Sequence, residues 1–260
     1  MSNFNQLPGS VQKSLTDHSL LKVISGLSNF KIESVVKIAK ASFYGGADLI
    51  DIACSPEIVK EVAKNCDIPI CVSSVEPELF LPAIQAGAEM IEIGNFDSFY
   101  PNGRFFDSEE VLDITRRTRS ISSSIFLSVT IPHTLPFHKQ GQLAIQLVEN
   151  GADAIQTEGS FIANPKGVGI QGLIENAVPT LAATYSIKQS LETAGYTEIP
   201  VICASGLSAV TIPMAFVSGA SGVGVGSAVN KLETEIEMIA SVKNLRKSSS
   251  LLSRKSVRLE

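Results

Sequence analysis

The segment Gly46-Ala47-Asp48-Leu49-Ile50-Asp51-Ile52 is the first of four copies of one pattern in this chain. In each copy a glycine follows a helical stretch and opens a short run rich in branched apolar residues. Glycine suits this junction because a helix commonly ends on a left-handed residue. The other three copies begin at Gly87, Gly151 and Gly219. The pattern therefore marks four points where a helix gives way to a strand.

A second pattern, Ile-Pro followed by an apolar run, opens two further strands at Ile68 and Ile199, because proline fits the first residue of a strand. Adding Lys22–Ser25 and Ile125–Val129 gives eight strands. Helical patterns fill the intervals at Ile32–Tyr44, Glu57–Asn65, Glu78–Ala86, Ser108–Ser120, Gln140–Asn150, Glu175–Ala194, Ser208–Ser218 and Ala228–Leu245.

Strands that alternate with helices indicate a parallel sheet, and eight such units indicate closure into a (β/α)8 TIM barrel of the aldolase type. The glycine pattern falls on even-numbered strands and Ile-Pro on the third and seventh, an alternation that an open sheet would not require. The length of 260 residues suits one barrel. We expect an N-terminal extension at 1–20, the barrel at 21–246 and a basic, serine-rich tail at 247–260.

The inward faces of the even strands carry polar residues. Because side chains alternate along a strand, Asp51, Glu92 and Gln156 should share one layer of the interior, with Gly224 leaving space beside them. Buried carboxylates are costly unless paired, and Lys22 is the one basic residue within a predicted strand. We predict that Lys22, Asp51 and Glu92 form a catalytic group; the alternative is a structural salt bridge without chemistry.

The chemistry of this group has further alternatives. Clustered charges shift one another's pKa values, as general acids and bases require. A Schiff base on Lys22 would need a depressed pKa, whereas two neighbouring acids raise it. Asp51 and Glu92 could also ligate Mg²⁺ together with a substrate phosphate, although no His/Asp metal spacing stands out.

The turns after the seventh and eighth strands resemble an anion site. These strands end in Ala204-Ser205-Gly206 and in Val225-Gly226-Ser227. Many barrels bind phosphate at this place with backbone amides and the start of a short helix. We predict phosphate binding by Ser205, Gly206, Gly226 and Ser227; the alternative is that small residues only allow tight turns.

Other polar residues follow the strands on the same face: Ser73, Asn95, His133 and Glu158. His133 is either a base or a solvated loop side chain. Cys54, after the second strand, lacks an evident base that would make it a nucleophile. The loops Asn95–Asp107 and Gly159–Leu173 could close over a ligand or be disordered.

Charge and composition exclude several classes of protein. Residues 243–260 hold six basic groups and one acid, which leaves 15 basic and 25 acidic groups, a net charge of −10, in the body. An acidic body argues against nucleic-acid binding, although the tail could meet an anionic partner. No apolar run reaches the roughly 20 residues of a membrane helix, and the first twenty residues resemble no signal or transit peptide. The four cysteines form no CxxC pair and show no metal-ligand spacing, which favours free thiols in a reducing compartment.

Three segments carry a family resemblance: Lys22–Phe30, Gly46–Pro56 and Pro69–Val75. Over roughly Leu21 to Leu245 the chain resembles the hypothetical chloroplast reading frame twenty-three family of algal plastids and cyanobacteria. The resemblance implies an aldolase-type barrel located in the plastid stroma or the cyanobacterial cytoplasm, and it implies no activity. More distantly, Ala204-Ser205-Gly206 and Gly222–Ser227 look like the phosphate grips of thiazole synthase, sugar-phosphate epimerases and flavin-linked barrels.

Three functional hypotheses follow. The first is an isomerase, lyase or synthase acting on a phosphorylated small metabolite. The second is an oxidoreductase that holds FMN by its phosphate. The third is a non-catalytic regulatory or scaffolding barrel that retains an anion site. FMN and Mg²⁺ stay open as cofactors without a motif that points directly to either, and a homo-oligomer is compatible with the sequence.

Overall fold

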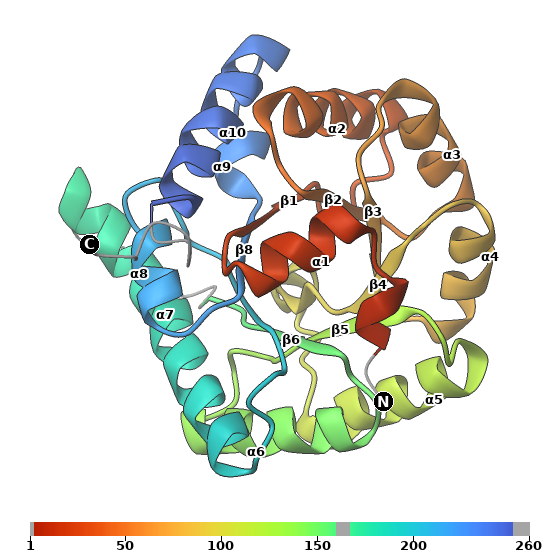
Figure 1. The fold of residues 1–260 in the computed structure, drawn as a ribbon, viewed down its shortest axis with the longest axis vertical. Coiled ribbons are helices and arrows are strands. Elements are labelled where there is room, and N and C mark those ends of the chain that lie inside the picture. The colour runs from red at the N-terminus through yellow and green to blue at the C-terminus, as the bar shows by residue number, and fades with distance from the viewer. Residues whose placement is uncertain (1–2, 160–166, 252–260) are drawn as a thin grey trace.

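A computed structural model describes residues 3–159 and 167–251 of the chain. Eight parallel strands close into a barrel in sequence order, β1 pairing with β8, which confirms the predicted fold (Figure 1). The strands are β1 (Leu20–Ile24), β2 (Leu49–Ala53), β3 (Ile70–Ser74), β4 (Met90–Ile93), β5 (Phe126–Thr130), β6 (Ala154–Gln156), β7 (Val201–Ala204) and β8 (Gly222–Val225). Parts of the predicted loop 159–173 and of the predicted tail, namely 160–166 and 252–260, lie outside the described residues.

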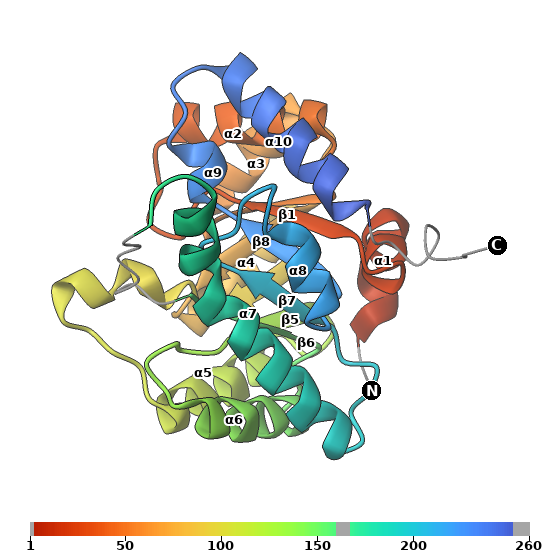
Figure 2. The same cartoon turned by 90° about the vertical axis from the view of Figure 1, so that its left-hand side faces the viewer.

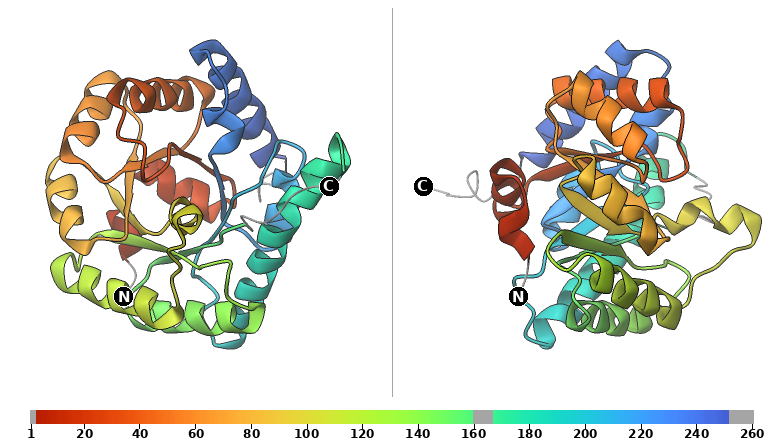
Figure 3. Two further views of the ribbon diagram at one scale, coloured as in Figure 1. Left: turned by 180° about the vertical axis from the view of Figure 1, so that it is seen from behind. Right: turned by 90° about the vertical axis from the view of Figure 1, so that its right-hand side faces the viewer.

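A ring of helices surrounds the strands (Figures 1 and 3). The α-helices are α1 (Gly9–Thr16), α2 (Ile32–Gly45), α3 (Pro56–Asn65), α4 (Phe80–Gln85), α5 (Ser108–Ile121), α6 (Phe137–Glu149), α7 (Ile170–Thr193), α8 (Ile212–Val217), α9 (Ser227–Asn230) and α10 (Glu235–Ser249). Short 3-10 helices are η1 (Asn3–Gln6), η2 (Pro77–Leu79), η3 (Phe96–Ser98) and η4 (Tyr100–Asn102).

The glycine pattern works as the sequence indicates. All four of its glycines adopt positive φ, with values of 84° at Gly46, 117° at Gly87, 99° at Gly151 and 97° at Gly219. Gly46 is the left-handed cap of α2, and its amide donates to the Phe43 carbonyl at 3.1 Å. Each glycine thus turns the chain from a helix into the strand that follows.

The apolar core has two parts. Outward strand residues such as Ile50 and Ile91 pack with the helix ring in one large cluster. Inward residues at the start of the strands form a second cluster with Val11 and Leu15 of α1, and Phe4 stacks edge-on against Phe126. Helix α1 lies across this end of the barrel in Figure 1 and at its right-hand end in Figure 2. Phe4 and helix α1 of the N-terminal extension therefore close the base of the barrel.

The C-terminal helix differs from the expected single helix over 228–245. It divides into α9 and α10, because Thr234 and Glu237 form a capping box that starts α10 anew. Helix α10 continues to Ser249, past the predicted boundary at 246. Within this last part of the helix, the Arg246 guanidinium pairs with Asp48 and donates to the Ser19 and Gly46 carbonyls, both at 2.9 Å.

Candidate active site

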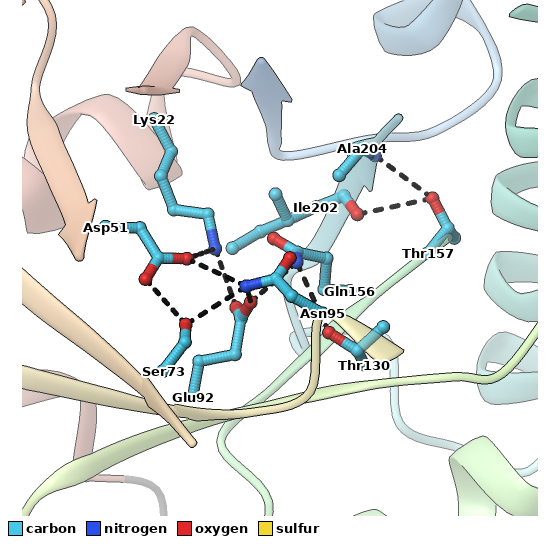
Figure 4. Close-up of polar contacts among 10 residues, drawn as sticks. All are labelled: Lys22, Asp51, Ser73, Glu92, Asn95, Thr130, Gln156, Thr157, Ile202 and Ala204. Carbon is cyan, nitrogen blue, oxygen red and sulfur yellow. Dashed lines mark hydrogen bonds and ion pairs between the residues drawn. The ribbon is translucent and has the colours of Figure 1, made fainter. Parts of the chain in front are cut away.

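The predicted charged group exists inside the barrel. Lys22 Nζ lies 2.6 Å from Glu92 Oε2 and 3.2 Å from Asp51 Oδ2, and all three side chains are buried (Figure 4). Ser73 donates to Asp51 Oδ1 at 2.5 Å, so the free side of that carboxylate is also satisfied. The prediction that strands one, two and four bring these charges together is confirmed in position. Their role in chemistry stays a prediction.

Electrostatics tie the three groups to one another. Burial alone would lower the pKa of Lys22, but the carboxylates of Glu92 and Asp51 outweigh it and raise that pKa above its ordinary value. Burial raises the pKa of Glu92, against the attraction of Lys22. A lysine held charged in this way is a poor Schiff-base nucleophile. Its amine also occupies the space between the carboxylates where Mg²⁺ would have to sit.

Two side-chain amides lie between this cluster and the mouth of the barrel. Gln156 donates through Nε2 to Glu92 Oε1 at 2.6 Å and to Thr130 Oγ1 at 3.3 Å. Asn95 donates through Nδ2 to Asp51, Ser73 and Glu92 at 3.1–3.4 Å. Asn95 has φ 62° and follows Gly94 at φ 139°, an unusual turn that directs its side chain back into the barrel.

A cavity of about 310 Å³ opens above these amides at the carboxyl ends of the strands. All four predicted phosphate-binding residues line it, as do Asn95, Gln156 and Glu158. Lys22, Asp51 and Glu92 do not line it; they lie beneath its floor. Asn95 and Gln156 therefore lie between the three charged residues and the cavity, and a catalytic role for Lys22, Asp51 and Glu92 stays a prediction.

The residues of the two predicted phosphate-binding turns line this cavity. No residue within 3–159 or 167–251 accepts a hydrogen bond from the amides of Ser205, Gly206, Gly226 or Ser227. Ser205 adopts φ 77° and Gly206 φ 69°, and a side chain at Gly206 would meet the Asn176 carbonyl at 2.4 Å. The first turn is thus held in a strained form against α7. Strain of this kind concentrates at ligand sites.

A second polar group stands at the wall of the cavity around Glu158. Its carboxylate accepts from the Asp97 amide at 2.8 Å and from the Tyr100 hydroxyl at 2.6 Å. His133 approaches it with its backbone amide at 3.3 Å and with Nδ1 at 3.1 Å. The segment containing η3 and η4, coloured yellow, covers the centre of the barrel mouth in the left view of Figure 3. The hydrogen bonds that Glu158 accepts from Asp97 and Tyr100 therefore hold that segment against the barrel.

Asp97 and Lys231 are cavity residues that the sequence reasoning did not select. Partial desolvation and then the neighbouring Glu158 carboxylate raise the pKa of Asp97 to about 6. Tyr100 was also missed. The signal for it was available in the run Asn95-Phe96-Asp97-Ser98-Phe99-Tyr100, where polar and aromatic residues follow a strand end directly.

Other candidates contribute nothing to this cavity. Ser73 lies in the charged cluster below it, and His133 stands on the far side of Glu158. Burial, then Asp51, raise the pKa of Cys54 to about 12, and its thiol donates to the Leu79 carbonyl at 3.3 Å. Such a thiol is not a nucleophile at neutral pH.

In the described part of the chain, no helix has the length and apolar character to cross a membrane.

Fold and site together define an aldolase-type TIM barrel with a polar cavity at the carboxyl ends of its strands. Solved structures of this class are similar in fold. (S)-3-O-geranylgeranylglyceryl phosphate synthase from Thermoplasma acidophilum, in complex with its substrate sn-glycerol-1-phosphate, matches with a TM-score of 0.63 and 13% identity over 93% of this chain and 98% of its own. Thiamine phosphate pyrophosphorylase from Pyrococcus furiosus matches with a TM-score of 0.58 and 18% identity over 90% and 97%.

The family is shown by sequence. Residues 3–255 match the family described as "Protein of unknown function (DUF561)". The uncharacterized protein ycf23 of Cyanophora paradoxa is 46% identical over 86% of this chain and 90% of its own. That of Pyropia yezoensis is 37% identical over 90% and 83%. The chain belongs to this ycf23 (DUF561) family, whose relatives here are plastid proteins of algae, and this confirms the resemblance noted in the sequence.

Proposed function

We propose that this protein is an enzyme of the isomerase, lyase or synthase type that acts on a phosphorylated small metabolite. The observation that carries the proposal is a set of four backbone amides around one cavity, at Ser205, Gly206, Gly226 and Ser227, which have no acceptor among the residues that the structure describes. Backbone amides at turns and at a helix start are favourable anion ligands. We place this activity in the plastid stroma or the cyanobacterial cytoplasm.

In this proposal the ionisable residues around and below the cavity have different roles. Asp97 and Glu158 line the cavity, and a carboxyl with a pKa near 6 can exchange protons at neutral pH. Lys231 adds a cation on the side of the short helix α9. Lys22, Asp51 and Glu92 act from below, by holding the floor amides in one orientation and setting the charge beneath them.

The first test places a charge where the phosphate would bind. Ser227 is exposed and is the first residue of α9, so an acid there is tolerated by the fold. We expect Ser227→Asp to weaken binding of inorganic phosphate on the order of 100-fold, because two anions would share the same amides. Isothermal titration calorimetry measures this.

The matched control is Ser227→Asn, which changes size equally and adds no charge. It should bind phosphate nearly as well as the wild type. Equal binding of phosphate by Ser227→Asp and Ser227→Asn would show that the anion does not bind at these turns. Mass spectrometry of small molecules carried through native purification would then show which phosphorylated compound the wild type retains.

A second test uses pH. Asp97 faces Glu158 and His133, and above a pH of about 6 its carboxylate repels an anion in the shared cavity. Sulfate keeps its charge over this range and avoids the titration of phosphate itself. We expect sulfate affinity to rise about three- to tenfold as pH falls from about 7.5 to 5. In Asp97→Asn the rise in sulfate affinity should be smaller than in the wild type; a rise as large as that of the wild type would contradict the role of Asp97.

A further inference from the structure

The floor of the cavity consists of two amides whose orientation is fixed. Carboxylates only accept hydrogen bonds, so the side-chain nitrogen of Gln156 must face Glu92 Oε1 at 2.6 Å. Turning this amide over would place two oxygens against each other. The same holds for Asn95, because its Nδ2 contacts Asp51 and Glu92. The amide oxygens are therefore assigned to the opposite side.

Gln156 Oε1 is a buried acceptor that lacks a donor among the described residues. The Gln156 side chain is about 1% exposed and lines the cavity. Its oxygen faces Gly224, where an added Cβ would lie 3.5 Å away, and Gly224 lines the same cavity. A buried acceptor left unpaired costs free energy comparable to a lost hydrogen bond. A donor supplied by a ligand would recover it.

The charges beneath the floor favour such a donor. One ammonium, on Lys22, faces the two carboxylates of Asp51 and Glu92, so the cluster holds one excess negative charge when all three are ionised. The amide oxygens above it add negative ends of dipoles. The floor thus repels an anion, whereas the turns at the rim attract one. A ligand that fits both carries its phosphate at the rim and a hydrogen-bond donor at the floor.

We propose that the ligand is a phosphate monoester of a short hydroxylated carbon chain, such as a small polyol or sugar phosphate, whose hydroxyl donates to Gln156 Oε1. This inference rests on the proposed phosphate site. Gly224 lies in β8, and Gly226 follows the end of that strand two residues later, which is about 7 Å along an extended chain. A few carbon atoms span that distance between the hydroxyl and the phosphate.

The test compares three probes by calorimetry on the full chain: inorganic phosphate, n-propyl phosphate and glycerol 3-phosphate. A fourth ligand, 2-aminoethyl phosphate, offers an ammonium in place of the hydroxyl donor. We expect glycerol 3-phosphate to bind about tenfold or more tightly than n-propyl phosphate, since only it supplies the donor. In Gln156→Met this ratio should fall to near one. The matched control Gln140→Met removes another buried glutamine, which donates to the Leu135 carbonyl and lies outside this cavity, and should keep the full ratio.

The possible failures are distinguishable. If none of the three probes binds, the proposed phosphate site itself fails. If n-propyl phosphate and glycerol 3-phosphate bind equally, the phosphate site stands and the hydroxyl subsite is overturned. Tighter binding of 2-aminoethyl phosphate than of glycerol 3-phosphate would also overturn it, in favour of an ammonium donor. The comparison of ligands on the wild type is decisive even if Gln156→Met does not fold.

Discussion

Lys22→Met is expected to lower the free energy of unfolding by about 3–5 kcal/mol at neutral pH. The methionine fills a similar volume, but it leaves the Asp51 and Glu92 carboxylates buried without a cation. Removing one partner of a buried ion pair costs more than the pair itself contributes. Urea unfolding followed by circular dichroism measures the loss.

The sign of the pH dependence gives this prediction a second readout. Burial raises the pKa of Glu92 in the folded state, and the variant also loses the attraction of Lys22 that opposes this rise. An acid with a raised folded pKa destabilises the protein above its unfolded pKa, and the penalty disappears as pH falls. The variant should therefore gain stability relative to the wild type as pH falls from neutral towards the ordinary pKa of a glutamate. The wild type should keep the contribution of Lys22 until pH rises through that residue's raised pKa.

A neutral cluster provides the control. The triple variant Lys22→Met, Asp51→Asn, Glu92→Gln removes all three charges and should recover most of the stability, without the pH response. If Lys22→Met alone costs less than about 1 kcal/mol, the carboxylates are not buried as an ionised pair around the amine.

The strand starts and the inward-facing residues could be predicted because the same sequence pattern recurs along the chain. Gly46 and its three counterparts mark the starts of strands because each helix-to-strand junction needs a left-handed residue. The alternation of side chains along those strands then places Asp51, Glu92 and Gln156 inside the barrel. The pairing of Lys22 follows from charge alone, since no other basic residue lies in any of the eight predicted strands. These inferences use only local periodicity and the cost of burying charge.

The depth of each residue along the barrel axis was not predictable in the same way. Whether Glu92 reaches the cavity depends on Asn95, whose left-handed backbone turns it over the cluster, and the sequence shows no periodicity in that loop. The partners of Glu158 come from two separate loops, through Asp97, Tyr100 and His133. Contacts between loops depend on loop conformation, which local patterns do not determine.

Gly94→Ala is expected to have the second large effect, a loss of about 2–5 kcal/mol in the free energy of unfolding. Gly94 is buried at φ 139°, and an added Cβ would lie 2.3 Å from Thr130 Cβ on the neighbouring strand. Two costs therefore combine, the backbone strain and the overlap between the ends of β4 and β5. Neither can be relieved by a rotamer change, because the contact is with a Cβ atom.

Gly103→Ala separates the two costs. Gly103 also has positive φ, at 74°, but an added Cβ there meets nothing within 4 Å. In this variant the free energy of unfolding should fall by only about 1–2 kcal/mol, the strain of placing an alanine in a left-handed backbone conformation. The difference between the two variants measures the overlap at Thr130. Because Gly94 also sets the turn of Asn95, its variant alone should lose the preference for glycerol 3-phosphate over n-propyl phosphate. A Gly94→Ala protein that keeps this preference would show that the floor of the cavity does not depend on the Gly94–Asn95 turn.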